Sequence, residues 1–176
     1  MKNIKLQVPG TVANLVCGFD ILGMAVNEPF DEMEFKLLNE RKVIIHHQDE
    51  FNLPTEPEKN VAGVVLQKIL EKLENQYIGF EVTINKKIKP GSGLGSSAAS
   101  AAGAAFGANE LLGNIFSNEE LVHFAMFGEE LASGSRHADN IAPCLFGGIT
   151  LVKSSEPIDI IPLSSPDLYV SAVHPQ

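Results

Sequence analysis

A glycine-rich stretch at residues 90–100, PGSGLGSSAAS, has the composition of an anion-binding loop. Glycine stands at positions 91, 93 and 95, where it allows the backbone to approach a ligand closely. Ser96 and Ser97 follow and open an alanine-rich run, SSAASAAGAAFGANELL, which predicts a helix. The free N–H groups and the dipole at the start of such a helix attract negative charge. Residues 90–97, here called the glycine loop, are therefore predicted to bind a polyphosphate.

The glycine loop differs from the two most common phosphate-binding loops. No Gly-Lys-Ser/Thr follows it, which excludes a Walker A loop, and the spacing of its glycines does not fit the G-x-G-x-x-G of dinucleotide folds. A flexible connector is the plain alternative, but connectors do not normally adjoin a strong helix-forming run. Lys86, Lys87 and Lys89 precede the loop and bring positive charge to it. These features favour an anion site over a connector.

Two further stretches carry carboxylate and amide side chains close together. Residues 8–23, VPGTVANLVCGFDILG, contain Asn14 and Asp20, and residues 128–148, GEELASGSRHADNIAPCLFGG, contain two glutamates and the sequence HADN. Taken singly, such residues have ordinary explanations, because Asn and Asp are common in turns and a glutamate at a helix end is commonly a solvated charge. These residues are predicted to form a catalytic site only if the three stretches act together.

The hydrophobic pattern predicts the strands that must position these residues. β-Branched and aromatic residues indicate strands at 3–8, 32–38, 42–48 and 78–85, the first and last with clear alternation. Late strands are expected at 144–153 and 168–173, separated by prolines.

Three helices are predicted between the strands. Residues 60–74 place six apolar side chains on one stripe, and the alanine-rich run forms the second helix. The third begins at Ser117, where SNEE supplies a capping box from Ser117 to Glu120. Because strands and helices do not alternate regularly, the pattern predicts an α+β fold and not a doubly wound sheet.

Length and charge limit the classes of function. With 176 residues and 44% hydrophobic content, the chain is predicted to form one globular domain. Its formal net charge of −9 argues against a nucleic-acid partner. No signal stretch or long apolar run is present, so we expect a cytoplasmic protein with no membrane partner. The two cysteines, Cys17 and Cys144, lack C-x-x-C spacing and are expected to be buried thiols that form neither a disulfide nor a zinc site.

The three stretches together resemble the signatures of the GHMP small-molecule kinases. PGSGLGSSAAS looks like the second signature of that superfamily, while residues 8–23 and 128–148 resemble the opening strand-loop and the active-site segment of its homoserine kinase family. The motifs stand in the expected order. One departure is visible, because the loop proline usually stands one position earlier, where this chain has Lys89.

The resemblance implies ATP and Mg²⁺ as cofactors. A phosphate cradle and a metal that offsets phosphate charge are what phosphoryl transfer requires. The resemblance carries the metal to Ser97 and Glu129, whose hydroxyl and carboxylate are hard oxygen ligands. Asn60 resembles the family's adenine-contacting position, although capping of the first helix explains it nearly as well. The implied cofactor-binding residues are Asn60, Lys89, Pro90, Gly91, Ser92, Gly93, Leu94, Gly95, Ser96, Ser97 and Ala98.

The resemblance also implies L-homoserine as the small-molecule substrate, whose hydroxyl would receive the phosphoryl group to give O-phospho-L-homoserine, a step of threonine biosynthesis. Asp139 and Asn140 are the catalytic candidates: the aspartate could act as a general base, whereas the asparagine could only orient the hydroxyl, and the sequence does not decide between them. Asp20 suits an ammonium group. The implied substrate-binding residues are Asn14, Asp20, His137, Asp139 and Asn140.

Members of the family have a second, ferredoxin-like domain, and the arginines that clamp the substrate carboxylate lie in it. This chain contains only Arg41 and Arg136. Residues 1–176 are therefore expected to be the N-terminal, ATP-binding GHMP domain alone, with the ribosomal protein S5 domain 2-like fold. Two alternatives stay open: another GHMP kinase, acting in the mevalonate pathway or on a sugar, and a nucleotide-binding module without catalysis. The oligomeric state also stays open, a homodimer included.

Overall fold

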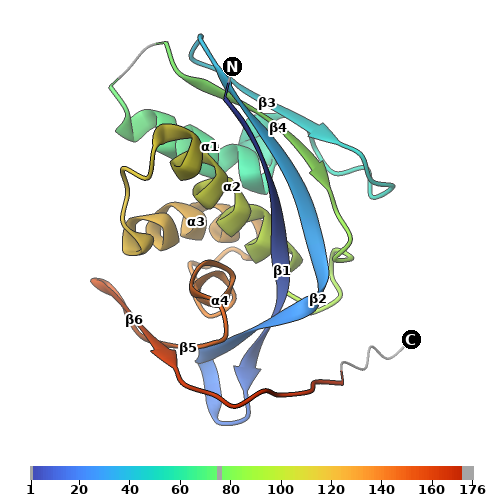
Figure 1. Cartoon of the computed structure of the whole chain (residues 1–176), viewed down its shortest axis with the longest axis vertical. Helices are drawn as coiled ribbons and strands as arrows, with labels where there is room; N and C mark the ends of the chain where they lie inside the picture. Colours follow the sequence, from blue (N-terminus) through green and yellow to red (C-terminus); the bar gives the residue numbers. More distant parts are fainter. Residues whose placement is uncertain (1, 75–76, 172–176) are drawn as a thin grey trace.

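A single mixed sheet forms the frame of the molecule (Figure 1). The computed structural model describes residues 2–74 and 77–171. Within them the strands run in the order β3-β4-β2-β5-β6, and β1 pairs with β2. Only β3 and β4 pair in parallel; the other described pairs are antiparallel. The strands are β1 (Asn3–Leu15), β2 (Gly18–Leu38), β3 (Val43–His47), β4 (Gly79–Asn85), β5 (Ile149–Ser155) and β6 (Ile158–Leu163).

The helices gather on one side of this sheet (Figure 1). A short 3₁₀ turn, η1 (Pro57–Lys59), precedes the first helix. The α-helices are α1 (Val61–Lys72), α2 (Ser96–Leu112), α3 (Asn118–Ser133) and α4 (Ile141–Phe146). The capping box predicted at Ser117 and Glu120 is present at the start of α3, with both of its reciprocal hydrogen bonds. The α+β class is confirmed.

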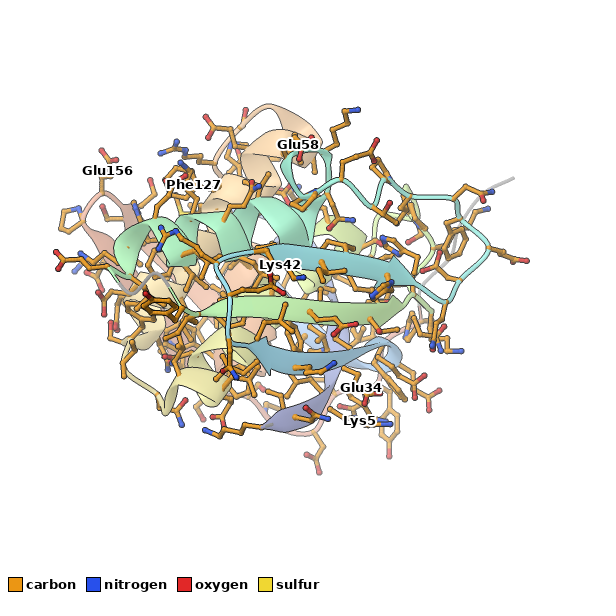
Figure 2. All side chains as sticks on the ribbon, turned by 90° about the horizontal axis from the view of Figure 1, so that it is seen from above. Lys5, Glu34, Lys42, Glu58, Phe127 and Glu156 are labelled. Carbon is orange, nitrogen blue, oxygen red and sulfur yellow. The ribbon has the colours of Figure 1, made fainter. Side chains whose placement is uncertain are left out.

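Alternation along β1 and β2 separates the core from the solvent. Met33 and Phe35 on β2 are fully buried under the helices. Glu34 points the other way and forms an ion pair with Lys5 on β1, 3.1 Å away (Figure 2). This period of two is what a sheet with one covered face requires.

Helix α2 lies very close to the sheet because its side chains are small. A Cβ atom at Gly103 would lie 2.5 Å from the sulfur of Met33, and one at Gly107 would lie 2.5 Å from the ring of Phe35. The alanines between them are buried as well. The alanine-rich composition therefore brings the N-terminus of α2, and the glycine loop that precedes it, up against β1 and β2.

The end of the chain differs from the prediction. The strand expected at 144–153 begins only at Ile149, because residues 141–146 form α4 instead. Short apolar runs do not distinguish a strand from a buried helix by periodicity. The strand expected at 168–173 is wrong for residues 168–171, which have no regular structure, and its last two residues lie outside the described residues.

Two strand features were missed by the sequence analysis. Strand β6 was not predicted, and it contains Pro162, which is tolerated because β6 lies at the edge of the sheet. Strands β1 and β2 run on into a long hairpin that turns at residues 16–17. Cys17 lies exposed at that turn, so the expectation that it is buried is wrong, while Cys144 is partly buried. No helix in the described part of the chain is long and apolar enough to cross a membrane.

Candidate active site

The glycine loop joins β4 to α2 and has the backbone that its composition predicts. Gly91, Gly93 and Gly95 have φ angles of +76°, +79° and +64°. Side chains other than glycine rarely adopt this left-handed conformation. Gly95 then serves as the N-cap of α2, so the free N–H groups of the helix open directly onto the loop.

Strand β1 holds the loop in place through Thr11, which the sequence analysis did not single out. The Thr11 N–H donates a hydrogen bond to the Leu94 carbonyl at 3.1 Å, and the Thr11 hydroxyl donates to Oδ1 of Asn140 at 2.8 Å. A Cβ atom at Gly95 would lie 2.0 Å from the same hydroxyl. Gly95 is thus required both by its φ angle and by the close approach of β1, the loop and the HADN segment.

A cavity of about 620 Å³ lies against the loop. Its size falls within the range of small-molecule and cofactor sites. Besides the loop, the cavity is lined by His47 at the end of β3 and by Pro54, Lys59 and Val61 around η1. Of the predicted cofactor-binding residues, those lining the cavity are Asn60, Pro90, Gly91, Gly93, Gly95, Ser96 and Ser97.

The remaining predicted cofactor-binding residues do not line this cavity. Ala98 is fully buried in the core, and the Leu94 carbonyl is taken by Thr11. Lys89 and Ser92 form a turn, in which the Ser92 N–H donates to the Lys89 carbonyl at 3.1 Å. These residues shape the loop, and any contact between them and a ligand stays a prediction.

Asn60 combines the two roles that the sequence left open. Its side-chain oxygen accepts from the Gly63 N–H at 3.1 Å and caps α1. Its amide nitrogen lies 2.7 Å from the Pro54 carbonyl and 3.0 Å from Nε2 of His47. The residue is buried and still lines the cavity. The capping role is present; the adenine contact stays a prediction.

Ser97 and Glu129 meet although they are 32 residues apart. The Ser97 hydroxyl, in the first turn of α2, donates to a carboxylate oxygen of Glu129 on α3 at 2.9 Å. Burial raises the pKa of Glu129, while the hydrogen bond from Ser97 partly offsets that rise. In the part of the chain that the structure describes, no cluster of three or more His, Cys, Asp or Glu side chains forms a metal site.

The HADN segment places Asn140 in the cavity and Asp139 behind it. Asn140 lines the cavity, whereas Asp139 does not. The Asp139 carboxylate is buried and accepts from the Asn140 N–H at 3.0 Å. Burial raises the pKa of Asp139. Gly23 on β2 permits this packing, because a Cβ atom there would lie 1.7 Å from the Asp139 carbonyl oxygen.

Asp20 and His137 lie together at the surface, next to Asp139. Their side chains, 41% and 49% exposed, approach to 3.8 Å between Oδ1 of Asp20 and Nδ1 of His137, and the charges of both influence the pKa of Asp139. These three residues are here called the 20/137/139 cluster. Asn14 lines the cavity and also performs the turn chemistry expected of it, accepting from the Asp20 N–H at 2.7 Å.

Lys86 differs from the expectation of positive charge beside the loop. Its ammonium group is buried and paired with the buried carboxylate of Asp31. The sequence gives no sign of this pair, because the two residues are 55 positions apart and Asp31 lies in no recognisable motif. Lys87 and Lys89 are exposed.

Comparison with known proteins agrees with this arrangement. The model of the GHMP kinases N terminal domain matches residues 60–148. Among curated proteins, the chain is similar to homoserine kinases of Methanococcus maripaludis, with 46% identity, and of Chloroherpeton thalassium, with 43% identity. The alignments cover 92% and 99% of this chain but 54% and 59% of those proteins. The chain thus spans little more than half the length of these relatives.

Solved structures show the same relationship. The crystal structure of homoserine kinase from Cytophaga hutchinsonii superimposes with a TM-score of 0.86 at 45% identity, covering 94% of this chain and 53% of that one. The mevalonate kinase of Methanococcus jannaschii gives a TM-score of 0.71 at 17% identity, which is a likeness of fold alone. The family model spans about half of the chain, from the N-cap of α1 through the glycine loop to the residue before β5. The chain therefore belongs to the GHMP kinases.

Proposed function

We propose that this chain is the nucleotide-binding half of a homoserine kinase, which transfers the γ-phosphoryl group of ATP to the hydroxyl of L-homoserine. The observation that carries the proposal is the hydrogen bond between Ser97 and Glu129 beside the glycine loop. It joins a hydroxyl at a helix N-terminus to a partly buried carboxylate, next to a cavity of nucleotide size. The identity of 41–46% to curated homoserine kinases supports the choice of substrate.

The glycine loop would hold the phosphates. Its backbone N–H groups and those at the start of α2 can donate to phosphate oxygens, and the positive φ angles leave room for close approach. The segment around His47, Pro54 and Asn60 would face the base and ribose at the other end of the cavity.

Ser97 and Glu129 fit a magnesium ion. Both offer hard oxygen atoms, and burial of the Glu129 carboxylate leaves a negative charge that a cation would stabilise. Among the described residues, no lysine or arginine forms an ion pair with Glu129. When bound, the ion would neutralise charge on the transferred phosphoryl group. Ser97 and Glu129 would supply two of its ligands, and phosphate oxygens and water suit the others.

Asn140 and the 20/137/139 cluster would receive the acceptor. Asp20 suits the ammonium group of an amino acid, and Asn140, held by Thr11, can orient the hydroxyl. The Asp139 carboxylate bonds to the Asn140 backbone and lies outside the cavity lining. That geometry favours a role in positioning over one as general base, and a loose transition state tolerates the lack of a base.

The same proposal includes a C-terminal half that completes the enzyme. It also includes a role in threonine biosynthesis and a cytoplasmic location. The lengths of the relatives support it, because this chain aligns with just over half of each. The isolated chain should fold and bind MgATP weakly, since the cleft would stay open to water and the substrate carboxylate would lack its partners.

The test is a coupled ADP-release assay with MgATP on the full-length protein and on residues 1–176, using homoserine, mevalonate and galactose in turn. We expect turnover with homoserine by the full-length protein and negligible turnover by the isolated chain. Preference for mevalonate or a sugar would overturn the substrate assignment. Comparable turnover by the two proteins would overturn the division into halves, and nucleotide binding without any turnover would indicate a non-catalytic module.

A further inference from the structure

A buried ion pair lies directly behind the glycine loop. It joins Asp31, on β2, to Lys86, the residue that follows β4. The two side chains are 0% and 2% exposed. Because removing two charges from water costs about as much free energy as their attraction returns, such a pair is weak evidence for a purely stabilising role.

The ammonium group of Lys86 has no donor left for a ligand. Besides Asp31, it donates to the Ser96 carbonyl at 3.0 Å and to the Ser100 hydroxyl at 2.9 Å. An ammonium group has three donors, and these three acceptors use all of them. Lys86 borders the cavity, yet its charge is already directed at α2 and at Asp31.

The carboxylate of Asp31 holds the entry to the loop. Its Oδ1 accepts from the Lys87 N–H at 2.7 Å and from the Ile88 N–H at 2.9 Å, while Oδ2 accepts from Lys86. The Ile88 carbonyl in turn accepts from the Ser96 hydroxyl at 2.9 Å. The pair is thereby bonded both to the segment that enters the loop and to the first turn of α2 where the loop ends.

We propose that the Asp31–Lys86 pair is a positioning device that fixes the separation of the two ends of the glycine loop, and through it the affinity for MgATP. Neither residue contacts the nucleotide in this account. The inference rests on the proposed function, since it takes the glycine loop as the phosphate site. The competing account makes Lys86 a phosphate ligand that Asp31 merely holds in the absence of nucleotide.

The direction in which Asp31→Asn changes the affinity for MgATP separates these two possibilities. If the pair positions the loop, Asp31→Asn keeps an acceptor for the Lys87 and Ile88 amides but turns an NH2 group toward the Lys86 ammonium group. The pair is then broken, and MgATP binding should weaken by about tenfold or more, as it should in Lys86→Met. If Lys86 is a phosphate ligand, Asp31→Asn frees its charge, and MgATP binds as tightly as before or more tightly. Calorimetric titration of the full-length protein measures both variants, and unchanged or tighter binding by Asp31→Asn overturns the proposal.

A double substitution separates positioning from loss of folding. Asp31→Asn with Lys86→Met leaves no unpaired buried charge, so its unfolding temperature should recover relative to the single variants. Its MgATP affinity should stay at least tenfold weak, and recovery of affinity together with stability would overturn the proposal. Lys36→Met with Glu81→Gln is the matched control, because that pair, 2.9 Å apart and partly exposed, joins β2 to β4 away from the loop. The control should keep wild-type affinity.

Hydrogen exchange of the protein without nucleotide gives a reading that does not depend on the proposed function. The amides of residues 91–97 should exchange faster in the double variant than in the wild type and in the control pair, and equal rates would overturn the positioning role. If the wild-type protein binds no MgATP, the proposed function fails, while the exchange comparison still tests the pair. In kinetics, the variants should raise KM for ATP more than they lower kcat.

Discussion

Behind the glycine loop, buried polar groups pair with one another, whereas Asp20, on the β1–β2 hairpin, and His137 carry their polar groups at the surface. Lys86, Asp31 and Thr11 are buried and bonded to the loop or to its flanking segments. Asp20 and His137 are about half exposed and approach each other only to 3.8 Å. The end proposed for the nucleotide is thus built in advance, and the end proposed for the acceptor stays open.

The backbone of the β1–β2 hairpin contains several residues in the left-handed conformation. Asn14, Val16 and Asp20 all have positive φ angles, which are uncommon outside glycine and especially so for a β-branched residue. Val16 and Phe19 are exposed at its tip. Surface and strain of this kind suit a segment that a second domain or a bound substrate would order. If the proposed function holds, this chain provides a preformed nucleotide site and depends on further contacts for its acceptor.

The largest expected effect concerns the metal site proposed at Ser97 and Glu129. Glu129→Gln keeps the shape of the side chain and removes its charge, so turnover in the full-length protein should fall by about 10²- to 10³-fold. Steady-state assays across Mg²⁺ concentrations measure this. Glu130→Gln is the control, because the neighbouring Glu130 is exposed and pairs with Arg136 at 2.8 Å. Equal activity of the two variants would remove Glu129 from the metal site.

The HADN segment should show the next largest effect. Asn140→Ala removes the side chain that lines the cavity and should lower turnover by about 10²-fold with an unchanged pH profile. Asp139→Asn should cost about tenfold or less, because its carboxylate holds the Asn140 backbone from outside the cavity. A loss of about 10²- to 10⁴-fold in Asp139→Asn, with a shifted pH profile of kcat/KM, would instead make Asp139 the general base.

Two glycines of the loop offer a matched comparison at the nucleotide end. A Cβ atom at Gly95 would meet the Thr11 hydroxyl at 2.0 Å, whereas one at Gly93 would have no atom within 4 Å. Gly95→Ala should therefore weaken MgATP binding by about tenfold or more. Gly93→Ala should cost only the strain of its φ angle, about 1 kcal/mol or roughly fivefold. Titration with MgATP measures both, and equal affinities would show that packing against Thr11 does not shape the loop.

The smallest expected effect is a gain in stability. Burial raises the pKa of Glu129 above its ordinary value of 4.5, so the ionised form is disfavoured in the folded protein. The folded state loses stability as the pH rises from about 4 through the raised pKa, and the loss is complete above it. Without Mg²⁺ and nucleotide, Glu129→Gln should unfold about 1–3 °C higher than wild type at pH 8. The difference should vanish near pH 4, and a lower unfolding temperature at pH 8 would contradict the account.

The sequence predicted what depends on short stretches of chain. The capping box at Ser117 and the helix from Ser96 follow from local composition and were confirmed, whereas phosphate binding by the glycine loop stays a prediction. The meeting of Ser97 with Glu129 was also expected, but from family resemblance and not from spacing. Such contacts between distant segments depend on how α2 and α3 pack, which local pattern does not specify.

The features that were missed arise from long-range packing. In the sequence, Thr11 is an ordinary strand residue, and only the fold brings its hydroxyl to Asn140. Asp31 is likewise identified only by the fold, which places its carboxylate against the Lys86 ammonium group. Residues 141–146 form a helix that begins after Asn140, whose side chain makes no capping hydrogen bond, although their apolar run suits a strand equally well.

A structure of the full-length protein with Mg²⁺ and a non-hydrolysable ATP analogue tests the central claim most directly. The account predicts phosphate oxygens within hydrogen-bond distance of the N–H groups of residues 91–97, and a metal about 2.1 Å from Ser97 Oγ and a Glu129 carboxylate oxygen. Asp31 and Lys86 should stay paired behind the loop. Phosphates bound elsewhere, or a metal that contacts neither Ser97 nor Glu129, would contradict the assignment of the glycine loop as the nucleotide site of this kinase.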